Sequence, residues 1–312
     1  MIWYFISTYN LFIIGTDLFD FSLFICLLNM MIRIFPFIFV LLWSSAFITT
    51  KPIIDNSDPF AALAFRFALV AVGFFLFSIY SKQKILVNKR NFFESLFSGV
   101  LFHGFYLGGV FYSISIGMPT AIAALIVTLQ PVLTNALSGP ILNEKVSIKQ
   151  WVGVLLGFVG AGLVLGFDVG SKIPLAGLVA TIIALLAITF STLWQKKLSN
   201  NLPLSVSNMN QALGGCLFHL LVIILFIDPY IDFSQTFIIA MSHQVFLVSF
   251  GAFTILMYLI KNNSASKTVS IFFLIPATSA FMAWLFLNEN LTRLDLLGFL
   301  ITSIGVYIAT RD

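Results

Sequence analysis

The sequence predicts an all-α polytopic membrane protein with ten transmembrane helices arranged as two inverted five-helix repeats. Three observations lead to this prediction: an apolar composition, ten apolar runs of spanning length, and a similarity between the two halves of the chain. The 312 residues are 60% hydrophobic and 9% charged, with a mean hydropathy of +1.04. A soluble domain carries roughly 25% charged residues. This chain has too few polar groups to cover a surface in water, so we expect a lipid bilayer around it.

The apolar runs follow residue 30, and about 20 mostly apolar residues suffice to cross a bilayer. The expected spans are 34–51, 60–80, 92–115, 120–142, 148–167, 174–195, 205–227, 241–260, 267–288 and 293–310. The segments between them are short, which leaves no room for a soluble domain.

The first 30 residues do not fit this pattern, because Asp17 and Asp20 interrupt their apolar stretches. They also lack the basic start of a secretory signal. Three interpretations remain open. The segment forms an extra hydrophobic helix, or it lies in the membrane interface, or the start codon is assigned too early and Met30 or Met31 is the first residue.

Lys and Arg residues indicate the orientation, since cytoplasmic loops are enriched in them. If the run near residue 34 begins in the cytoplasm, twelve basic residues lie on the cytoplasmic side. Three lie on the other side: Lys51, Lys172 and Arg293. We therefore expect a multi-pass protein of the cell membrane (inner or plasma) with both ends of the ten-helix unit in the cytoplasm. The basic residues form no single patch, so no nucleic-acid partner is expected.

An internal repeat emerges when the sequence is shifted by 145 residues. Between 131 and 160 the shift gives seven identities, including Pro131 on Pro276, Asn143-Glu144 on Asn288-Glu289, Gly153 on Gly298 and Gly160 on Gly305. The same shift lays Lys51 on Lys196. The predicted division is an N-terminal extension at 1–30, a first repeat at 31–168 and a second repeat at 169–312. Because five helices per half is an odd number, the halves are inverted relative to each other, as in many secondary transporters.

The order and spacing of these short motifs resemble EamA-type proteins of the drug/metabolite transporter superfamily. The first half carries Leu41-Leu42-Trp43-Ser44-Ser45-Ala46-Phe47, Asp58-Pro59, Phe65-Arg66-Phe67, Gly117-Met118-Pro119, Leu129-Gln130-Pro131 and Leu142-Asn143-Glu144. The second half repeats the pattern with Leu274-Ile275-Pro276 and Leu287-Asn288-Glu289. The resemblance covers about residues 31–311. It implies ten helices in two inverted EamA repeats and a transporter that does not hydrolyse ATP.

Ionisable groups inside a bilayer are costly and indicate function. Arg66 lies about two turns into the second predicted span. It either extends its side chain to the interface or binds an anion, since guanidinium pairs with carboxylate or phosphate. His103 lies near the middle of the third span, with Tyr106 on a neighbouring face. These two residues either line a pocket or bond between helices.

Other polar and aromatic residues are further candidates for substrate binding. Gln130 precedes Pro131, whose ring can open a helix and free carbonyls near mid-membrane. Gln211 falls on Arg66 under the shift, which makes it the counterpart at equivalent depth. Trp43 and Trp284 lie several residues from helix ends and could form aromatic walls.

A second set of residues is expected to be structural. Glu144 and Glu289 follow predicted spans, where they would cap the next helix. Gly153 and Gly298 permit close helix approach, and Pro131 and Pro276 mark equivalent helix breaks.

No Walker A loop, metal-ligand constellation or catalytic triad occurs in the sequence. No enzyme activity, cofactor or metal is therefore expected, and an integral membrane enzyme is the least favoured class. The leading hypothesis is a secondary transporter of a small metabolite, with export of amino acids or related compounds favoured. An uptake or exchange carrier for a nucleotide-like or phosphorylated metabolite and a non-transporting membrane scaffold are the alternatives. The oligomeric state is expected to be a monomer or a homodimer.

Overall fold

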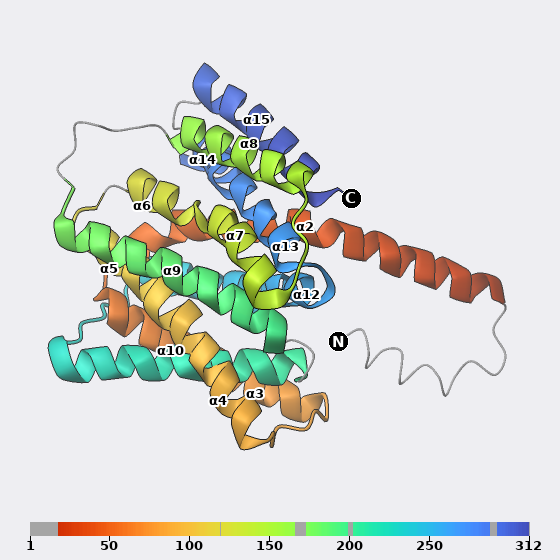
Figure 1. Ribbon diagram of the computed structural model, residues 1–312. Coiled ribbons are helices and arrows are strands. Elements are labelled where there is room, and N and C mark those ends of the chain that lie inside the picture. The colour runs from red at the N-terminus through yellow and green to blue at the C-terminus, as the bar shows by residue number, and fades with distance from the viewer. Residues whose placement is uncertain (1–17, 119, 166–172, 199–201, 288–291, 312) are drawn as a thin grey trace.

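The computed structural model describes residues 18–118, 120–165, 173–198, 202–287 and 292–311. These residues form a bundle of helices (Figure 1). Ten helical segments among them are long and apolar enough to cross a membrane, which confirms the predicted class and helix count.

The first repeat supplies five spans. They are α2 (Leu18–Asp55), α3 (Pro59–Tyr80), the unit α4–η1–α5 (Lys89–Gly99, Val100–Leu107 and Gly108–Ser115), the pair α6 and α7 (Thr120–Val127 and Gln130–Leu142), and α8 (Ile148–Leu165). The spanning part of α2 starts at Ile34. Residues 18–33 continue the same helix, which extends away from the other helices in Figure 1. The described part of the N-terminal segment therefore forms no separate helix.

The second repeat supplies five matching spans. They are α9 (Leu175–Leu198), α10 (Leu204–Phe226), the unit α11–η2–α12 (Gln235–His243, Gln244–Ala252 and Phe253–Asn262), the unit α13–η3–α14 (Ala265–Ser270, Ile271–Phe273 and Leu274–Leu287), and α15 (Arg293–Thr310). Because each repeat has an odd number of spans, the repeats cross the membrane in opposite senses.

Irregular backbone falls at equivalent positions in the two repeats. The third and eighth spans each contain a π-helical segment, η1 and η2, and the 145-residue shift superposes 100–107 on 245–252. Turn residues 128–129 separate α6 from α7, and η3 separates α13 from α14. Pro131 then lies in the first turn of α7, where a missing N–H costs no helical hydrogen bond. Pro276 lies at the corresponding place in α14.

The packing follows the relation between the two repeats, and two of the helix pairs join direct counterparts. α8 packs most extensively on α15, and α3 packs on α10. α9 lies against η1 and α5, as α2 lies against their counterparts η2 and α12. This exchange is the relation expected of two inverted halves around a pseudo-two-fold axis in the membrane plane.

Glycines allow α8 and α15 to approach to backbone contact. A Cβ atom on Gly160 would meet the main chain of Thr302 and Gly298, and one on Gly305 would meet that of Gly157 and Gly153. The predicted packing glycines Gly153 and Gly298 thus lie in a single helix crossing.

Glu144 caps a different helix from the predicted one. Its Oε1 accepts a hydrogen bond from the backbone N–H of Ala265 at 3.0 Å, at the start of α13. The following helix α8 is capped instead by Ser147 and Gln150, which bond each other's backbone N–H groups. The expected partner was therefore wrong, because a helix distant in sequence folds against the end of α7. Glu289 lies outside the described residues.

Candidate functional site

Four predicted site residues meet in the middle of the bundle. Arg66 from α3, His103 and Tyr106 from η1, and Trp43 from α2 are all buried, with 4 to 6% of each residue exposed. The Arg66 guanidinium lies close enough to Tyr106 and His103 for electrostatic interaction. Tyr106 and Trp43 both pack edge-on with the Phe102 ring, at centroid distances of 5.4 and 6.0 Å.

Arg66 makes few polar interactions for a buried cation. Its Nε donates to the Ser249 hydroxyl at 2.9 Å, and its guanidinium carbon lies 5.3 Å from the centre of the Phe67 ring. Among the described residues, no carboxylate forms an ion pair with it, and its two terminal nitrogens donate no hydrogen bond. A buried charge without a counter-ion is unfavourable in free energy. An anionic group bound next to Arg66 would therefore stabilise this position.

Two histidines lie next to this cation. His103 stacks between aromatic rings, with centroid distances of 4.3 Å to Phe67 and 4.6 Å to Phe253. The Nε2 of His219, from α10, lies 2.9 Å from the His103 carbonyl oxygen. The Nδ1 atoms of both histidines are buried without a partner. We name Trp43, Arg66, His103, Tyr106, His219 and Ser249 the central cluster.

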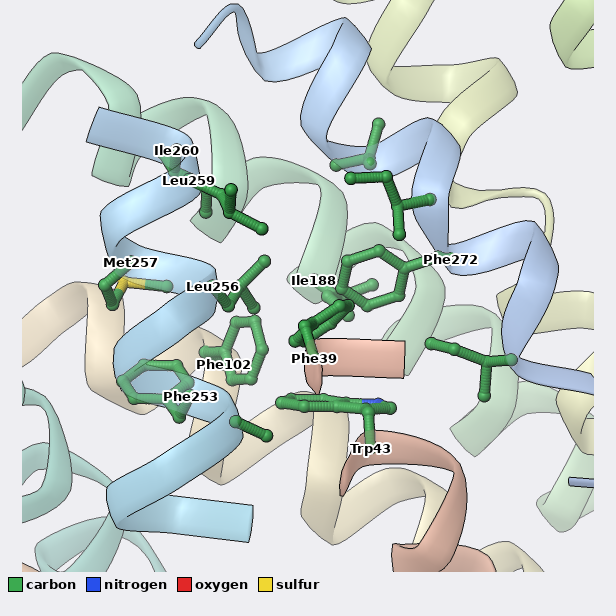
Figure 2. Packing of buried hydrophobic residues seen from close by; sticks show 14 of the residues in the cluster. Phe39, Trp43, Phe102, Ile188, Phe253, Leu256, Met257, Leu259, Ile260 and Phe272 are labelled. Atoms are coloured by element: carbon green, nitrogen blue, oxygen red, sulfur yellow. The ribbon is translucent and has the colours of Figure 1, made fainter. Parts of the chain in front are cut away.

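An aromatic wall borders the central cluster. Figure 2 shows the Trp43 ring lying below Phe39, with Phe102 and Phe272 nearby. The ring centroids of Phe39, Phe102 and Phe272 lie 5.3, 6.0 and 5.8 Å from that of Trp43. These rings come from α2, η1 and η3, so the wall spans both repeats.

The π-helical segments bring these groups together. A π-helical turn shifts the register of the backbone and is frequent at functional sites. η1 carries His103, Tyr106 and the carbonyl that meets His219, while η2 carries Ser249. Sequence reasoning missed Ser249 and Phe253, because nothing in a run of common apolar and small residues distinguishes them.

Gln211 lies in a separate polar group. Its Oε1 accepts from Gln195 Nε2 at 2.8 Å, and its Nε2 donates to the Ser207 hydroxyl at 3.1 Å. Gln195 also donates to Ser191, which bonds Ser98. We name Ser98, Ser191, Gln195, Ser207 and Gln211 the polar network. No hydrogen bond between the described residues joins it to Arg66.

Gln130 and Trp284 also lie apart from the central cluster. Gln130 donates through Nε2 to the Thr192 hydroxyl at 3.0 Å, and its Oε1 is buried without a partner. Trp284 packs on Phe281 at a centroid distance of 5.5 Å and is 45% exposed. The structure therefore joins four of the seven candidates, and places the other three elsewhere.

The bonding of Gln211 leads to a prediction about its role. The Gln211→Leu variant should lose about 1 kcal/mol of stability, since it leaves the Gln195 amide without its acceptor in a buried site. Thermal unfolding in detergent measures this loss, and substrate binding should persist. A variant that keeps the wild-type melting temperature and loses binding would instead make Gln211 a binding residue.

The comparisons with known proteins agree with this architecture. The sequence matches the EamA-like transporter family over residues 12–166 and 175–311. It is 25% identical over 296 residues to a WAT1-related chloroplastic protein of Arabidopsis thaliana, covering 89% of this chain and 68% of that protein. It is 22% identical over 280 residues to a probable amino-acid metabolite efflux pump of Salmonella typhimurium, covering 86% of this chain and 91% of the pump.

A solved structure shares the fold. The crystal structure of another protein superposes on this chain with a TM-score of 0.76 at 17% sequence identity. The match covers 89% of this chain and 97% of the other. With both halves of the sequence matched and ten spans in two repeats, the chain belongs to the EamA-like transporter family.

Proposed function

We propose that the protein exports small carboxylate-bearing metabolites, with amino acids as the favoured substrates, and that Arg66 binds the carboxylate. A membrane transporter for small molecules is the function that the family supports. The finer assignment rests on one observation, the buried guanidinium of Arg66, which has a hydroxyl partner and no carboxylate among the described residues.

The surroundings of Arg66 suit an amphipathic anion. A carboxylate accepts two parallel hydrogen bonds from a guanidinium, and the terminal nitrogens of Arg66 are available for them. The ammonium or apolar part of an amino acid would lie near the aromatic wall, to which Trp43 and Phe102 belong. The efflux pump of Salmonella typhimurium, a relative by sequence, supports export of amino-acid metabolites as the class to test.

We place the protein in the cell membrane with both ends of the ten-helix unit in the cytoplasm, as the distribution of Lys and Arg favours. The second candidate is exchange of a phosphorylated or nucleotide-like metabolite. Guanidinium also pairs with phosphate, so the observation on Arg66 suits this class as well. Gln130 and Trp284 remain candidates for contacts made when a substrate is bound.

Proteoliposome transport with matched substrates tests the proposal. We would load vesicles with an aromatic amino acid, with its amine lacking the carboxylate, with its acid lacking the amino group, and with a nucleoside monophosphate. The two carboxylates should exchange across the membrane, and the amine should leak no faster than from empty-membrane controls. Transport of the amine alone would contradict a role for Arg66 in carboxylate binding.

Two further outcomes separate the alternatives. Exchange of the nucleoside monophosphate without the amino acid would support the phosphorylated-metabolite carrier. Absence of transport for all four compounds, by protein that elutes as a single folded species, would reject the proposed substrates.

A further inference from the structure

Two lysines that the internal repeat superposes have different environments. Lys196 lies in the last turn of α9, and Lys51 lies at the corresponding place near the end of α2. The side chain of Lys51 is 84% exposed, and its Nζ lies 3.7 Å from a carboxylate oxygen of Asp55 on the same helix. Lys196, by contrast, contacts a different span.

Lys196 binds the C-terminal end of α12. Its Nζ donates to the backbone carbonyls of Ile260 at 3.0 Å, Lys261 at 3.3 Å and Asn263 at 2.6 Å. The last carbonyls of a helix have no partner within the helix, and the helix dipole favours a cation there. Lys196 therefore ties the end of α9 to the end of α12.

Further contacts join helix ends on the same side of the membrane. We name this side, where α7, α9 and α12 end and α13 begins, the Lys196 face. Glu144 at the end of α7 caps the start of α13 and interacts electrostatically with Lys196. The Ser266 hydroxyl of α13 bonds Asn135 of α7. Four spans thus meet at one turn, which joins α12 to α13.

At the opposite face, which we name the Lys51 face, hydrogen bonds join Asn56 and Asp58 of the α2–α3 turn to the segment before α11. No hydrogen bond between the described residues joins α5 or α6 to α14 there. There the turn after α5 corresponds to the turn after α12. α13 packs on α7 at the Lys196 face, but the equivalent pair at the Lys51 face, α6 and α14, shows no comparable packing. Ser115, the last residue of α5, is exposed, and so is Gly117, whose φ of 91° ends the helix.

We propose that Lys51 and Lys196 hold the two faces closed in alternate transport states. Here Lys196 holds its own face closed. In the opposite state Lys51 donates to the backbone carbonyls of Ser115 and Ile116 at the end of α5, and Lys196 releases α12. The 145-residue shift pairs these carbonyls with those of Ile260 and Lys261.

The local structure keeps the free-energy cost of moving Lys51 to the end of α5 small. α5 already contacts α2, so Lys51 lies on a neighbouring helix. Its present partner Asp55 is 56% exposed, and exposed ion pairs are weak. Moving the Lys51 side chain from Asp55 to the end of α5 therefore breaks only a weak ion pair. In its new position the ammonium group incurs no cost of an unpaired charge, because the last carbonyls of α5 have no partner within the helix and can accept its hydrogen bonds.

Distances between spin labels test this proposal, independently of which substrate is carried. Labels would be attached in a Cys26→Ser/Cys216→Ala background. One pair, at Lys145 and Asn262, reports the Lys196 face, and the other, at Ser115 and Leu285, reports the Lys51 face. All four positions are exposed, and labelling Ser115 leaves its main-chain carbonyl in place.

The two lysines should act in opposite directions. Lys196→Met should lengthen the distance at the Lys196 face and shorten it at the Lys51 face, changing the population ratio roughly three- to tenfold. Adding Lys51→Met to that variant should reverse the change, and adding Lys51→Arg should not. Lys197→Met is the matched control, since Lys197 is the exposed neighbour of Lys196, and it should leave both distances unchanged.

Three results would overturn the proposal. Lys196→Met fails to shift either distance, or Lys51→Met fails to reverse the shift, or Lys197→Met produces the same shift as Lys196→Met. Elution of each variant as a single species verifies that it is folded. Because no substrate is added, failure here leaves the carboxylate proposal standing, and failure of that proposal leaves these distances unaffected.

Discussion

Replacing Arg66 by methionine is expected to abolish substrate binding and to leave the substrate-free protein at least as stable as the wild type. Arg66 is buried with a serine hydroxyl as its hydrogen-bonding partner and no carboxylate among the described residues. An uncompensated buried charge is unfavourable, and an apolar residue of similar volume often stabilises such a site. Loss of one partner of a buried charged pair costs about 2 to 4 kcal/mol of binding, so affinity should fall roughly 30- to 700-fold.

Thermal unfolding with and without substrate measures both effects, because a ligand that binds the native state raises the melting temperature. The wild type should shift with a carboxylate ligand and Arg66→Met should not. Arg66→Lys keeps the charge but loses the planar pair of donors, so its shift should be intermediate. Ser249→Ala removes the hydroxyl that holds Nε and should weaken binding less than Arg66→Met.

The opposite pattern would reveal a structural role for this arginine. If Arg66→Met unfolds at a much lower temperature, and its folded fraction still binds the carboxylate, then Arg66 stabilises the bundle instead of binding substrate.

Replacing Gly160 by leucine is expected to prevent the two repeats from packing, which is the largest loss of stability among these variants. A Cβ atom at Gly160 would collide with the backbone of Thr302 and Gly298 in α15. Backbone atoms of a packed helix cannot move aside as a flexible side chain can. Even Gly160→Ala should therefore cost about 1 to 3 kcal/mol, and leucine more.

A neighbouring glycine provides the matched control for this prediction. A Cβ atom at Gly162 would meet only Leu125 Cδ1 at 3.8 Å, an ordinary contact. Gly162→Ala should therefore unfold at about the wild-type temperature. The fraction of detergent-extracted protein that remains monodisperse after heating measures all three variants. Equal stability of Gly160→Ala and Gly162→Ala would contradict the close crossing of α8 and α15.

The fold class was predictable from the sequence because a bilayer imposes a simple rule. A spanning segment must bond its own backbone groups and be apolar over about 20 residues, so ten helices can be recognised from composition alone. The repeat was recognisable because Pro131 with Pro276 and Gly153 with Gly298 share one register. The two prolines lie at helix breaks, and the two glycines lie where helix backbones touch. Few other side chains fit at either kind of position.

The candidate site was predictable only in part. Arg66 and His103 were identified because ionisable residues are rare in apolar runs. Gln211 was singled out by the same shift that pairs it with Arg66, yet it bonds Gln195 and Ser207 in another part of the bundle. The two repeats differ in side chains, so equal depth in the membrane did not bring these two residues together.

The sequence by itself determined the number of spans, the inverted repeat and the rare polar residues, because each depends on local composition or on spacing along the chain. Only the tertiary structure decided which polar residues meet, which helix end Glu144 caps, and that Lys196 contacts a second span while Lys51 is exposed. These facts depend on contacts between spans far apart in the sequence.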